Sequence, residues 1–216
     1  MSDSIATQLY LISPPKFDPD GFAAQLKEAV ANDIVTCFQL RMPGVSEAEL
    51  AETARRLAPI CWDHDVAFLL CDHVDLVKEL KLDGVHLEGN VSEQAVKEAR
   101  KSLGEEQSIG VSCFSSRHIA MLAGEAGADY VSFGPIFDSA TKDMDADPDA
   151  LEALRWWAVM MELPCVAVGG LTPDNCSDCV TRGADFLAVV SSIWNHPEGA
   201  GTAVKAFEKT ITGATS

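Results

Sequence analysis

Two short segments near the C-terminal end of the chain carry residue types suited to binding phosphate. They are Gly169-Gly170-Leu171-Thr172-Pro173 and Val190-Ser191-Ser192. Paired glycines let the backbone approach a ligand closely, and a Thr-Pro pair is typical of an N-cap followed by the first helical residue. Free N–H groups at a helix start attract anions, so we expect the glycine pair at 169–170 and the serine pair Ser191-Ser192 to present amide hydrogens to one phosphate. A tight turn and a capping serine form the structural alternative.

A polar pair, Gln39 and Arg41, ends an apolar run near residue 40. Residues two apart in a strand point to the same side, so both side chains are expected to reach one surface. The planar guanidinium of Arg41 suits bidentate contact with phosphate oxygens. A purely structural salt bridge of Arg41 is the other interpretation.

A long polar segment follows another apolar run and contains Ser139, Thr141 and Lys142. Two hydroxyls and one cation suit an oxyanion, and a connection longer than the usual ~4–6 residues is typical of a ligand lid. A solvated polar loop is the alternative.

Asp72 stands directly after the apolar run that ends at Cys71. Mg²⁺ typically uses one or two protein carboxylates while it bridges to substrate phosphates, so Asp72 is the metal candidate. Its alternative role is to cap the helix that follows. His86, inside a short apolar run, is expected to be a hydrogen-bonded core histidine.

Eight apolar runs, each followed by an amphipathic stretch, must position these residues. The runs are 9–12, 34–40, 66–71, 84–87, 108–112, 130–134, 164–169 and 186–190. Continuous apolar runs indicate strands buried on both faces, and their alternation with helices predicts a parallel sheet. We therefore expect residues 1–216 to form one α/β domain, a (β/α)8 barrel with its site at the carboxyl ends of the strands. A doubly wound open sheet is the rival, but no GxGxxG follows the first run.

Composition narrows the partners and the location. The formal net charge of −17 disfavours nucleic acid and anionic lipid. No apolar run reaches the ~18 residues of a membrane span, and Met1-Ser2-Asp3-Ser4 does not start like a secretory signal, so a cytoplasmic location is expected. The seven cysteines are expected to be reduced, and Cys176 and Cys179 to pack a helix, with metal or redox use as the alternative. Four tryptophans fit either helix packing or the interface of a homo-oligomer.

The same segments, taken in order, resemble the thiamine phosphate synthase and thiazole tautomerase superfamily. The matching pieces include Gln39-Leu40-Arg41, Gly84-Val85-His86-Leu87, Tyr130-Val131-x-Phe133-Gly134-Pro135, Thr141-Lys142 and Gly169-Gly170-Leu171-Thr172-Pro173. The resemblance implies a transferase of thiamine biosynthesis that joins hydroxymethylpyrimidine diphosphate to thiazole phosphate and releases diphosphate.

The resemblance also implies roles for individual residues. Arg41, Ser112 and Lys142 become the catalytic candidates. Gln39 and Arg41 would bind the pyrimidine diphosphate, and Asp72 would bind Mg²⁺. Ser139, Thr141 and Lys142 would serve the region between the substrates, and Gly169, Gly170, Val190 and Ser191 would hold the thiazole phosphate.

Several positions depart from the family pattern. Pro43 stands where the family has a lysine, Val91 stands where it has a second metal carboxylate, and Glu88 lies close to that position without matching it. Two other functions therefore stay open: a thiazole tautomerase-like isomerase and a phosphate-ligand-binding protein without catalysis. The catalytic histidine of the isomerase would fall at Phe114, one helical turn before His118.

Overall fold

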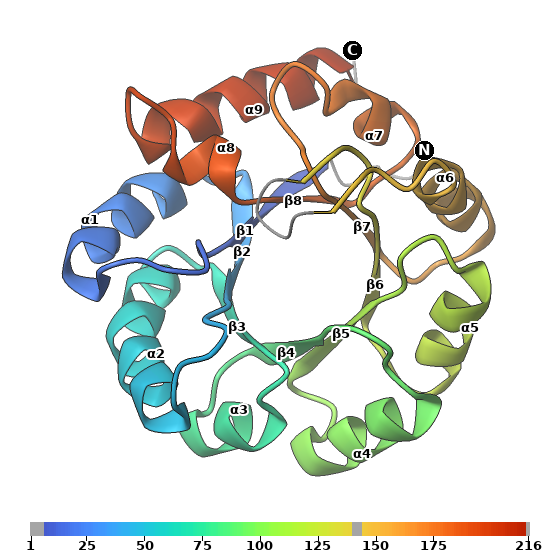
Figure 1. Cartoon of the computed structure of the whole chain (residues 1–216), viewed down its shortest axis with the longest axis horizontal. Coiled ribbons are helices and arrows are strands. Elements are labelled where there is room, and N and C mark those ends of the chain that lie inside the picture. The colour runs from blue at the N-terminus through green and yellow to red at the C-terminus, as the bar shows by residue number, and fades with distance from the viewer. Residues whose placement is uncertain (1–6, 140–143, 215–216) are drawn as a thin grey trace.

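The eight apolar runs form the eight strands of a closed parallel barrel. The structure is a computed structural model that describes residues 7–139 and 144–214. The strands are β1 (Gln8–Ile12), β2 (Val35–Leu40), β3 (Ala67–Cys71), β4 (Gly84–Leu87), β5 (Ser108–Ser112), β6 (Tyr130–Phe133), β7 (Cys165–Val168) and β8 (Phe186–Val189). Each strand pairs with the next, and β8 pairs with β1, which closes the barrel (Figure 1). The predicted (β/α)8 barrel is confirmed.

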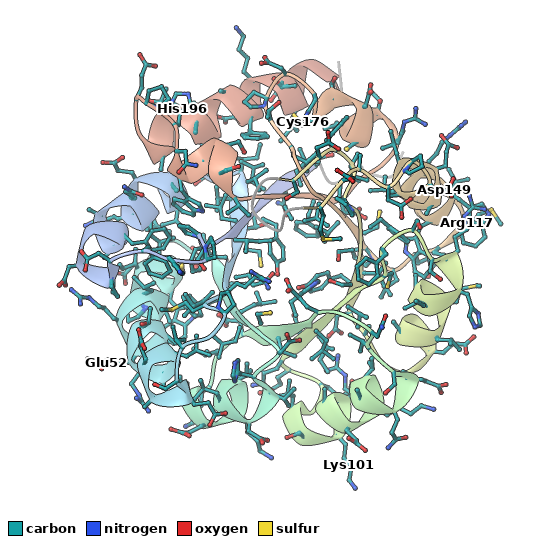
Figure 2. The ribbon with its side chains drawn as sticks, viewed as in Figure 1. Glu52, Lys101, Arg117, Asp149, Cys176 and His196 are labelled. Carbon is teal, nitrogen blue, oxygen red and sulfur yellow. The ribbon has the colours of Figure 1, made fainter. Side chains whose placement is uncertain are left out.

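Helices cover the outside of the barrel and follow the strands in turn (Figure 1). They are α1 (Pro19–Val30), α2 (Glu47–Trp62), α3 (Val74–Leu80), α4 (Glu93–Leu103), α5 (Arg117–Glu125), α6 (Ala150–Met160), α7 (Ser177–Thr181), α8 (Ser191–Trp194) and α9 (Ala200–Ala214). Figure 2 shows Glu52 and Lys101 extending outward from this ring, as the charge pattern of the amphipathic stretches requires. Among the described residues, no helix is both long and apolar enough to span a bilayer.

Helix starts follow from local side-chain chemistry. Ser46, Ser92 and Ser116 each accept a hydrogen bond from a backbone N–H three residues later, at 3.2 Å. Such caps satisfy one of the N–H groups that a helix start leaves free. Ser46 stands three residues before Glu49, a spacing that is typical of such caps.

The helix start predicted at Thr172-Pro173 is wrong. α7 begins at Ser177, and the segment before it is a turn closed by the Asn175 side chain. The Thr172 N–H donates to Asn175 Oδ1 at 2.8 Å, and Asn175 Nδ2 donates to the Gly170 carbonyl at 3.0 Å. The Cys176 N–H donates to the Thr172 carbonyl at 3.0 Å, so a single turn forms at Thr172, but continuous helix begins only at Ser177.

Three aspartates tie strands together at the end where β4, β6 and β8 begin. Asp83, Asp129 and Asp185 accept from the backbone N–H groups of Phe68, Ile109 and Cys165, at 2.7, 2.7 and 2.8 Å. Each aspartate precedes an even-numbered strand and reaches the strand before it. The amino-terminal end of the barrel is therefore fixed by repeated carboxylate contacts, and the opposite end is left for loops.

Two packed layers form the core. The larger lies between strands and helices and contains Trp157, Phe38, Phe68 and Phe207, all less than 2% exposed. The smaller fills the barrel interior and consists of Tyr10, Ile12, Cys37, Leu69, Tyr130, Val166 and Ala188. This inner layer holds two tyrosines, so the barrel interior is partly polar.

Candidate functional site

A cavity of about 250 Å³ opens at the carboxyl ends of the strands. Loops that follow β1, β2, β5, β6, β7 and β8 line it, through residues that include Arg41, Ser112, Gly170 and Ser191. The glycine segment after β7 and the serine segment after β8 therefore converge on one space, as the sequence predicted. Arg41 lies on the same cavity as these amides.

The glycines at 169 and 170 are required by both conformation and space. Their φ angles are +105° and +62°, a region that side chains rarely adopt. A Cβ on Gly170 would lie 2.4 Å from the Asp138 carbonyl oxygen, and one on Gly169 would lie 2.5 Å from Pro135 Cα. The chain after β7 thus packs directly against the chain after β6.

Two backbone amides of these segments point to no protein partner. Among the described residues, no acceptor is found for the N–H of Gly170 or for that of Ser191, the first residue of α8. Both residues line the cavity. An anion in the cavity could accept from them, since free N–H groups favour negative charge.

The segment after β6 folds over one side of the cavity. Ser139 and Met144 form an isolated antiparallel bridge, with N–H···O distances of 2.8 and 3.2 Å, and both line the cavity. Asp138 also lines it and accepts from the Ala146 N–H at 2.8 Å. The other two predicted residues of this segment, Thr141 and Lys142, lie outside the described residues.

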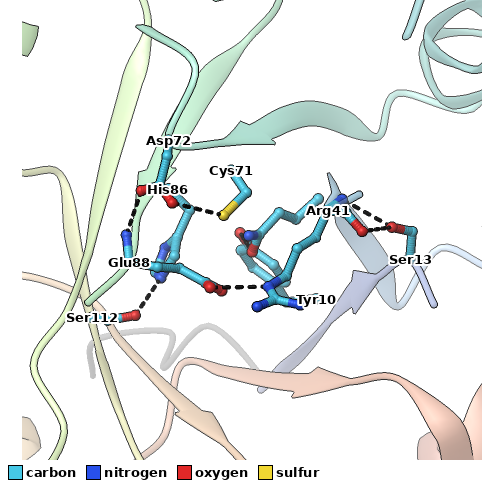
Figure 3. Close-up of polar contacts among 9 residues, drawn as sticks. Tyr10, Ser13, Arg41, Cys71, Asp72, His86, Glu88 and Ser112 are labelled. Carbon is cyan, nitrogen blue, oxygen red and sulfur yellow. Dashed lines mark hydrogen bonds and ion pairs between the residues drawn. The ribbon is translucent and has the colours of Figure 1, made fainter. Parts of the chain in front are cut away.

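Arg41 is held by groups on two sides (Figure 3). Its Nε lies 2.9 Å from Glu88 Oε2, and the two side chains are 20% and 15% exposed. Its backbone N–H donates to Ser13 Oγ at 2.9 Å, while the Ser13 hydroxyl donates to the Arg41 carbonyl at 3.1 Å. The salt-bridge interpretation of Arg41 therefore describes a real contact, which also places the guanidinium at the cavity.

Asp72, Cys71 and Glu88 form a cluster in which each offers one ligand atom within 4.8 Å of the others. Asp72 Oδ1 accepts from the Glu88 N–H at 2.7 Å, and Oδ2 accepts from the Cys71 thiol at 3.3 Å (Figure 3). Burial, followed by the charges of Glu88 and Asp72, raises the pKa of the Cys71 thiol far above its ordinary value. Cys71 therefore stays a thiol, and the oxygen atoms of the two carboxylates are the ligands on offer.

Asp72 is not the cap of α3. The residue before that helix is His73, which makes no side-chain cap bond, and Asp72 has a φ of +62°. This turn directs the carboxylate to Glu88 instead of to the helix. The capping alternative for Asp72 is wrong for this reason.

Gln39 lies deeper, in the barrel interior, and is 1% exposed. Its Oε1 accepts from the Tyr10 hydroxyl at 2.9 Å, and Tyr10 lies 3.0 Å from the Tyr130 hydroxyl. His86 Nδ1 lies 3.0 Å from that same Tyr130 hydroxyl, and His86 Nε2 lies 3.0 Å from Ser112 Oγ. His86 is thus the hydrogen-bonded core histidine that the sequence predicted.

A second cavity of about 30 Å³ adjoins this chain of contacts and is lined by all five of its residues. It shares Ser112, Ser132 and Val168 with the larger cavity, so it is the floor of the same site. Sequence reasoning did not assign Tyr10 or Tyr130 to the site. The sequence could have indicated both residues, because a tyrosine inside an apolar strand has a buried hydroxyl that needs a hydrogen-bond partner.

Two residues that depart from the synthase pattern, Pro43 and Val91, line neither cavity. Pro43 is exposed, and Val91 packs against the outer core. His118 is exposed on α5, and Phe114 takes the place at the cavity where a catalytic histidine was considered. Cys176 and Cys179 are fully buried free thiols in the core, as the packing interpretation predicted.

The fold and the position of the cavity are those of (β/α)8-barrel enzymes, whose active sites lie at the carboxyl ends of the strands. The family profile described as thiamine monophosphate synthase matches residues 9–193. The chain belongs to this family.

Individual relatives agree with that assignment. The chain is 51% identical over 213 residues to the thiamine-phosphate synthase of Erythrobacter litoralis, covering 97% of this chain and 98% of the relative. It is 43% identical over 206 residues to that of Rhodospirillum centenum, covering 95% and 98%. The solved structure of thiamine phosphate pyrophosphorylase from Pyrococcus furiosus matches with a TM-score of 0.81, 25% identity and 97% coverage of both chains.

Proposed function

We propose that this chain is a thiamine-phosphate synthase, a transferase that joins hydroxymethylpyrimidine diphosphate to thiazole phosphate with loss of diphosphate. One observation carries the proposal. A single cavity is lined by Arg41 and by Gly170 and Ser191, whose amides have no acceptor in the part of the chain that the structure describes. Both substrates are anions and must come together to react, so the cavity needs two separate anion-binding sites.

The thiazole phosphate fits the wall formed by Gly169, Gly170, Val190 and Ser191. Gly170 and Ser191 supply the unpaired N–H groups, and the tight contact of Gly170 with Asp138 holds its amide in place. Ser139 lies at the edge of this wall and can add a hydroxyl. Fixed amides bind an anion with no reorganisation, since their dipoles already point at it.

The diphosphate fits the opposite side, near Arg41, Asp72 and Glu88. Carboxylate oxygens suit Mg²⁺, and the ion typically uses one or two of them, so Asp72 and Glu88 match its needs. When bound, Mg²⁺ would supply positive charge to the departing diphosphate. Arg41, held by Glu88 and Ser13, would bind phosphate oxygens beside it.

Glu88 can replace the carboxylate that the family has at the position of Val91. It reaches Asp72 because its own backbone N–H donates to Asp72 Oδ1. The two carboxylates therefore stand together even though Glu88 does not match the family position. This arrangement supports synthase chemistry at the point where Val91 departs from the family pattern.

Ser112 lines both the larger and the smaller cavity. We assign it to the reacting region together with Arg41, and Thr141 and Lys142 stay predicted contributors from the loop after β6. A cytoplasmic location, a homo-oligomer, and the absence of nucleic-acid and membrane partners also stay predictions.

The isomerase alternative is less well supported. It needs a histidine at the cavity wall after β5, where Phe114 stands, and the nearby His118 is exposed on α5. Phe114 cannot transfer a proton. The histidine at the cavity floor, His86, comes from β4 and is buried in hydrogen bonds.

The test is synthesis of thiamine phosphate from both substrates and Mg²⁺ with purified protein, read by chromatography. We expect product, and we expect Asp72→Ala to abolish it. Asp75→Ala is the matched control, because Asp75 is an exposed carboxylate at the start of α3, outside the metal cluster. No product from the wild type at high enzyme concentration refutes the proposal. Isomerisation of a thiazole phosphate in chelator would favour the isomerase, and ligand stabilisation without any turnover would favour a binding protein.

A further inference from the structure

The chain of hydrogen bonds beneath the cavity has two ends that face the same small space. Gln39 forms one end and Ser112 the other, and Tyr10, Tyr130 and His86 link them through four contacts of 2.9–3.0 Å. At the Gln39 end, Nε2 is buried and has no hydrogen-bond partner within residues 7–139 and 144–214. A buried amide donor without a partner is costly, so this atom points to a ligand group that accepts from it.

A phenol has one proton to donate, and so has an uncharged imidazole, so with His86 in that form every bond of the chain has one direction. Burial raises the pKa of both tyrosines well above the ordinary value, so both phenols keep their proton. Tyr10 donates to Gln39 Oε1, so Tyr130 must donate to Tyr10. Tyr130 then has only lone pairs for His86, whose Nδ1 must carry the hydrogen. His86 Nε2 then carries no hydrogen and accepts from the Ser112 hydroxyl.

We propose that Tyr10, Tyr130 and His86 act as positioning residues that couple Gln39 to Ser112 and so determine which heteroaromatic ring the site accepts. With the directions above, Gln39 presents an N–H donor to the cavity floor, and Ser112 presents lone pairs. The matching ligand edge has a hydrogen-bond acceptor beside a donor, as a ring nitrogen next to an amino group does. The inference rests on the proposed function, in which the ring is the aminopyrimidine of the diphosphate substrate.

Hydrogen bonds of the opposite direction along the same chain of residues would select a different ring. Reversing the chain would turn the carbonyl oxygen of Gln39 and the hydroxyl hydrogen of Ser112 to the cavity. That arrangement would match a ring N–H beside a carbonyl, which is the edge of the oxo analogue of the same pyrimidine. One set of side chains thus distinguishes two rings of nearly equal shape by the direction of its bonds.

The direct test is the position of the hydrogen on His86, read from the imidazole ¹⁵N shifts by long-range ¹H–¹⁵N NMR. His86 is assigned by the signal that His86→Gln removes. In the wild type we expect the hydrogen on Nδ1. In Tyr10→Phe, Tyr130 loses the oxygen to which it donates and turns its hydrogen to His86 Nδ1. The imidazole hydrogen should therefore move to Nε2.

Two control variants separate this switch from a loss of packing. Ser112→Ala leaves the Tyr130 contact in place, so the hydrogen should stay on Nδ1. Leu69→Val trims the same inner core layer without touching a polar group and should also leave the hydrogen on Nδ1. Any other state in the wild type, or no move in Tyr10→Phe, overturns the inference.

A second measurement connects the switch to the ligand. The kcat/KM ratio for amino- over oxo-pyrimidine diphosphate should be at least about a hundredfold in the wild type, because a wrong partner leaves buried polar groups unpaired. Tyr10→Phe should lower this ratio about tenfold or more. An unchanged ratio refutes the coupling while the proposed function stands. If the wild type makes no thiamine phosphate at all, the proposed function fails, and the NMR result alone decides the coupling.

Discussion

Replacing Gly170 by alanine should damage the phosphate wall in a way that the structure lets us estimate. The left-handed φ of +62° costs a residue with a side chain about 1–2 kcal/mol. The added Cβ would lie 2.4 Å from the Asp138 carbonyl oxygen and 2.8 Å from Phe137 Cβ, and such overpacking costs about 1–3 kcal/mol. Together these terms lower the free energy of unfolding by about 2–5 kcal/mol.

Gly44→Ala is the matched control. Gly44 also has a left-handed φ, +82°, but apart from its chain neighbours no atom of the described residues lies within 4 Å of where its Cβ would be. It should therefore cost only the conformational term of about 1–2 kcal/mol.

The assay is thermal unfolding with and without thiazole phosphate. For a chain of this size each kcal/mol lowers the Tm by about 2–4 °C, so Gly170→Ala should fall by roughly 4–20 °C. Stabilisation by thiazole phosphate should also shrink, because the Gly170 amide is displaced, whereas Gly44→Ala should keep it. Equal Tm values and equal ligand stabilisation in the two variants would refute the assignment of this wall.

Three further changes test other parts of the account. Asp72→Asn should lower binding of Mg²⁺ measured by calorimetry in the presence of pyrophosphate, and unchanged binding would remove Asp72 from the metal site. Asp129→Ala leaves the buried N–H of Ile109 unpaired, so urea unfolding should show a loss of about 1–3 kcal/mol, with synthase activity kept in the folded protein; equal stability would contradict the strand-tie role. Stability should also fall as the pH rises above about 8.5, the ordinary thiol pKa. Burial raises the pKa of the Cys176 thiol to about 11 and that of Cys113 to about 12, so the unfolded chain releases protons that the folded chain keeps. A flat unfolding free energy between about pH 8 and pH 10 would contradict these shifts.

The fold could be predicted from the sequence because each strand is a short apolar run and each helix start has its own local signal. Gly84–Leu87 and Ser108–Ser112 coincide with the predicted runs, and Ser46 and Ser92 cap their helices through contacts three residues away. Such contacts depend only on neighbours in the chain, so a pattern of residues suffices to find them.

The start of α7 could not be predicted in the same way. The Thr172-Pro173 pair has the composition of a helix start, but the side chain of Asn175 closes a turn there first. An isolated turn and the first turn of a helix share the bond from the Cys176 N–H to the Thr172 carbonyl, so the residue pattern at Thr172-Pro173 does not distinguish them.

The part of the site that depends on closure of the barrel was also beyond sequence reasoning. Glu88 reaches Arg41 across 47 positions of the chain, and Tyr10 reaches Tyr130 across 120. Those pairs form because β1, β2, β4 and β6 surround the same barrel interior. The spacing of residues within one segment cannot predict contacts between segments so far apart in the chain. The convergence of Gly170 and Ser191 could be predicted only because parallel strands place their carboxyl ends together.

The most direct test of the central claim is a crystal structure of the protein with thiamine phosphate, pyrophosphate and Mg²⁺. We predict the phosphate of thiamine phosphate on the amides of Gly170 and Ser191, and pyrophosphate beside Arg41 with Mg²⁺ at Asp72 and Glu88. Density for both anions on the same wall, or for thiamine phosphate outside the cavity, would contradict the account.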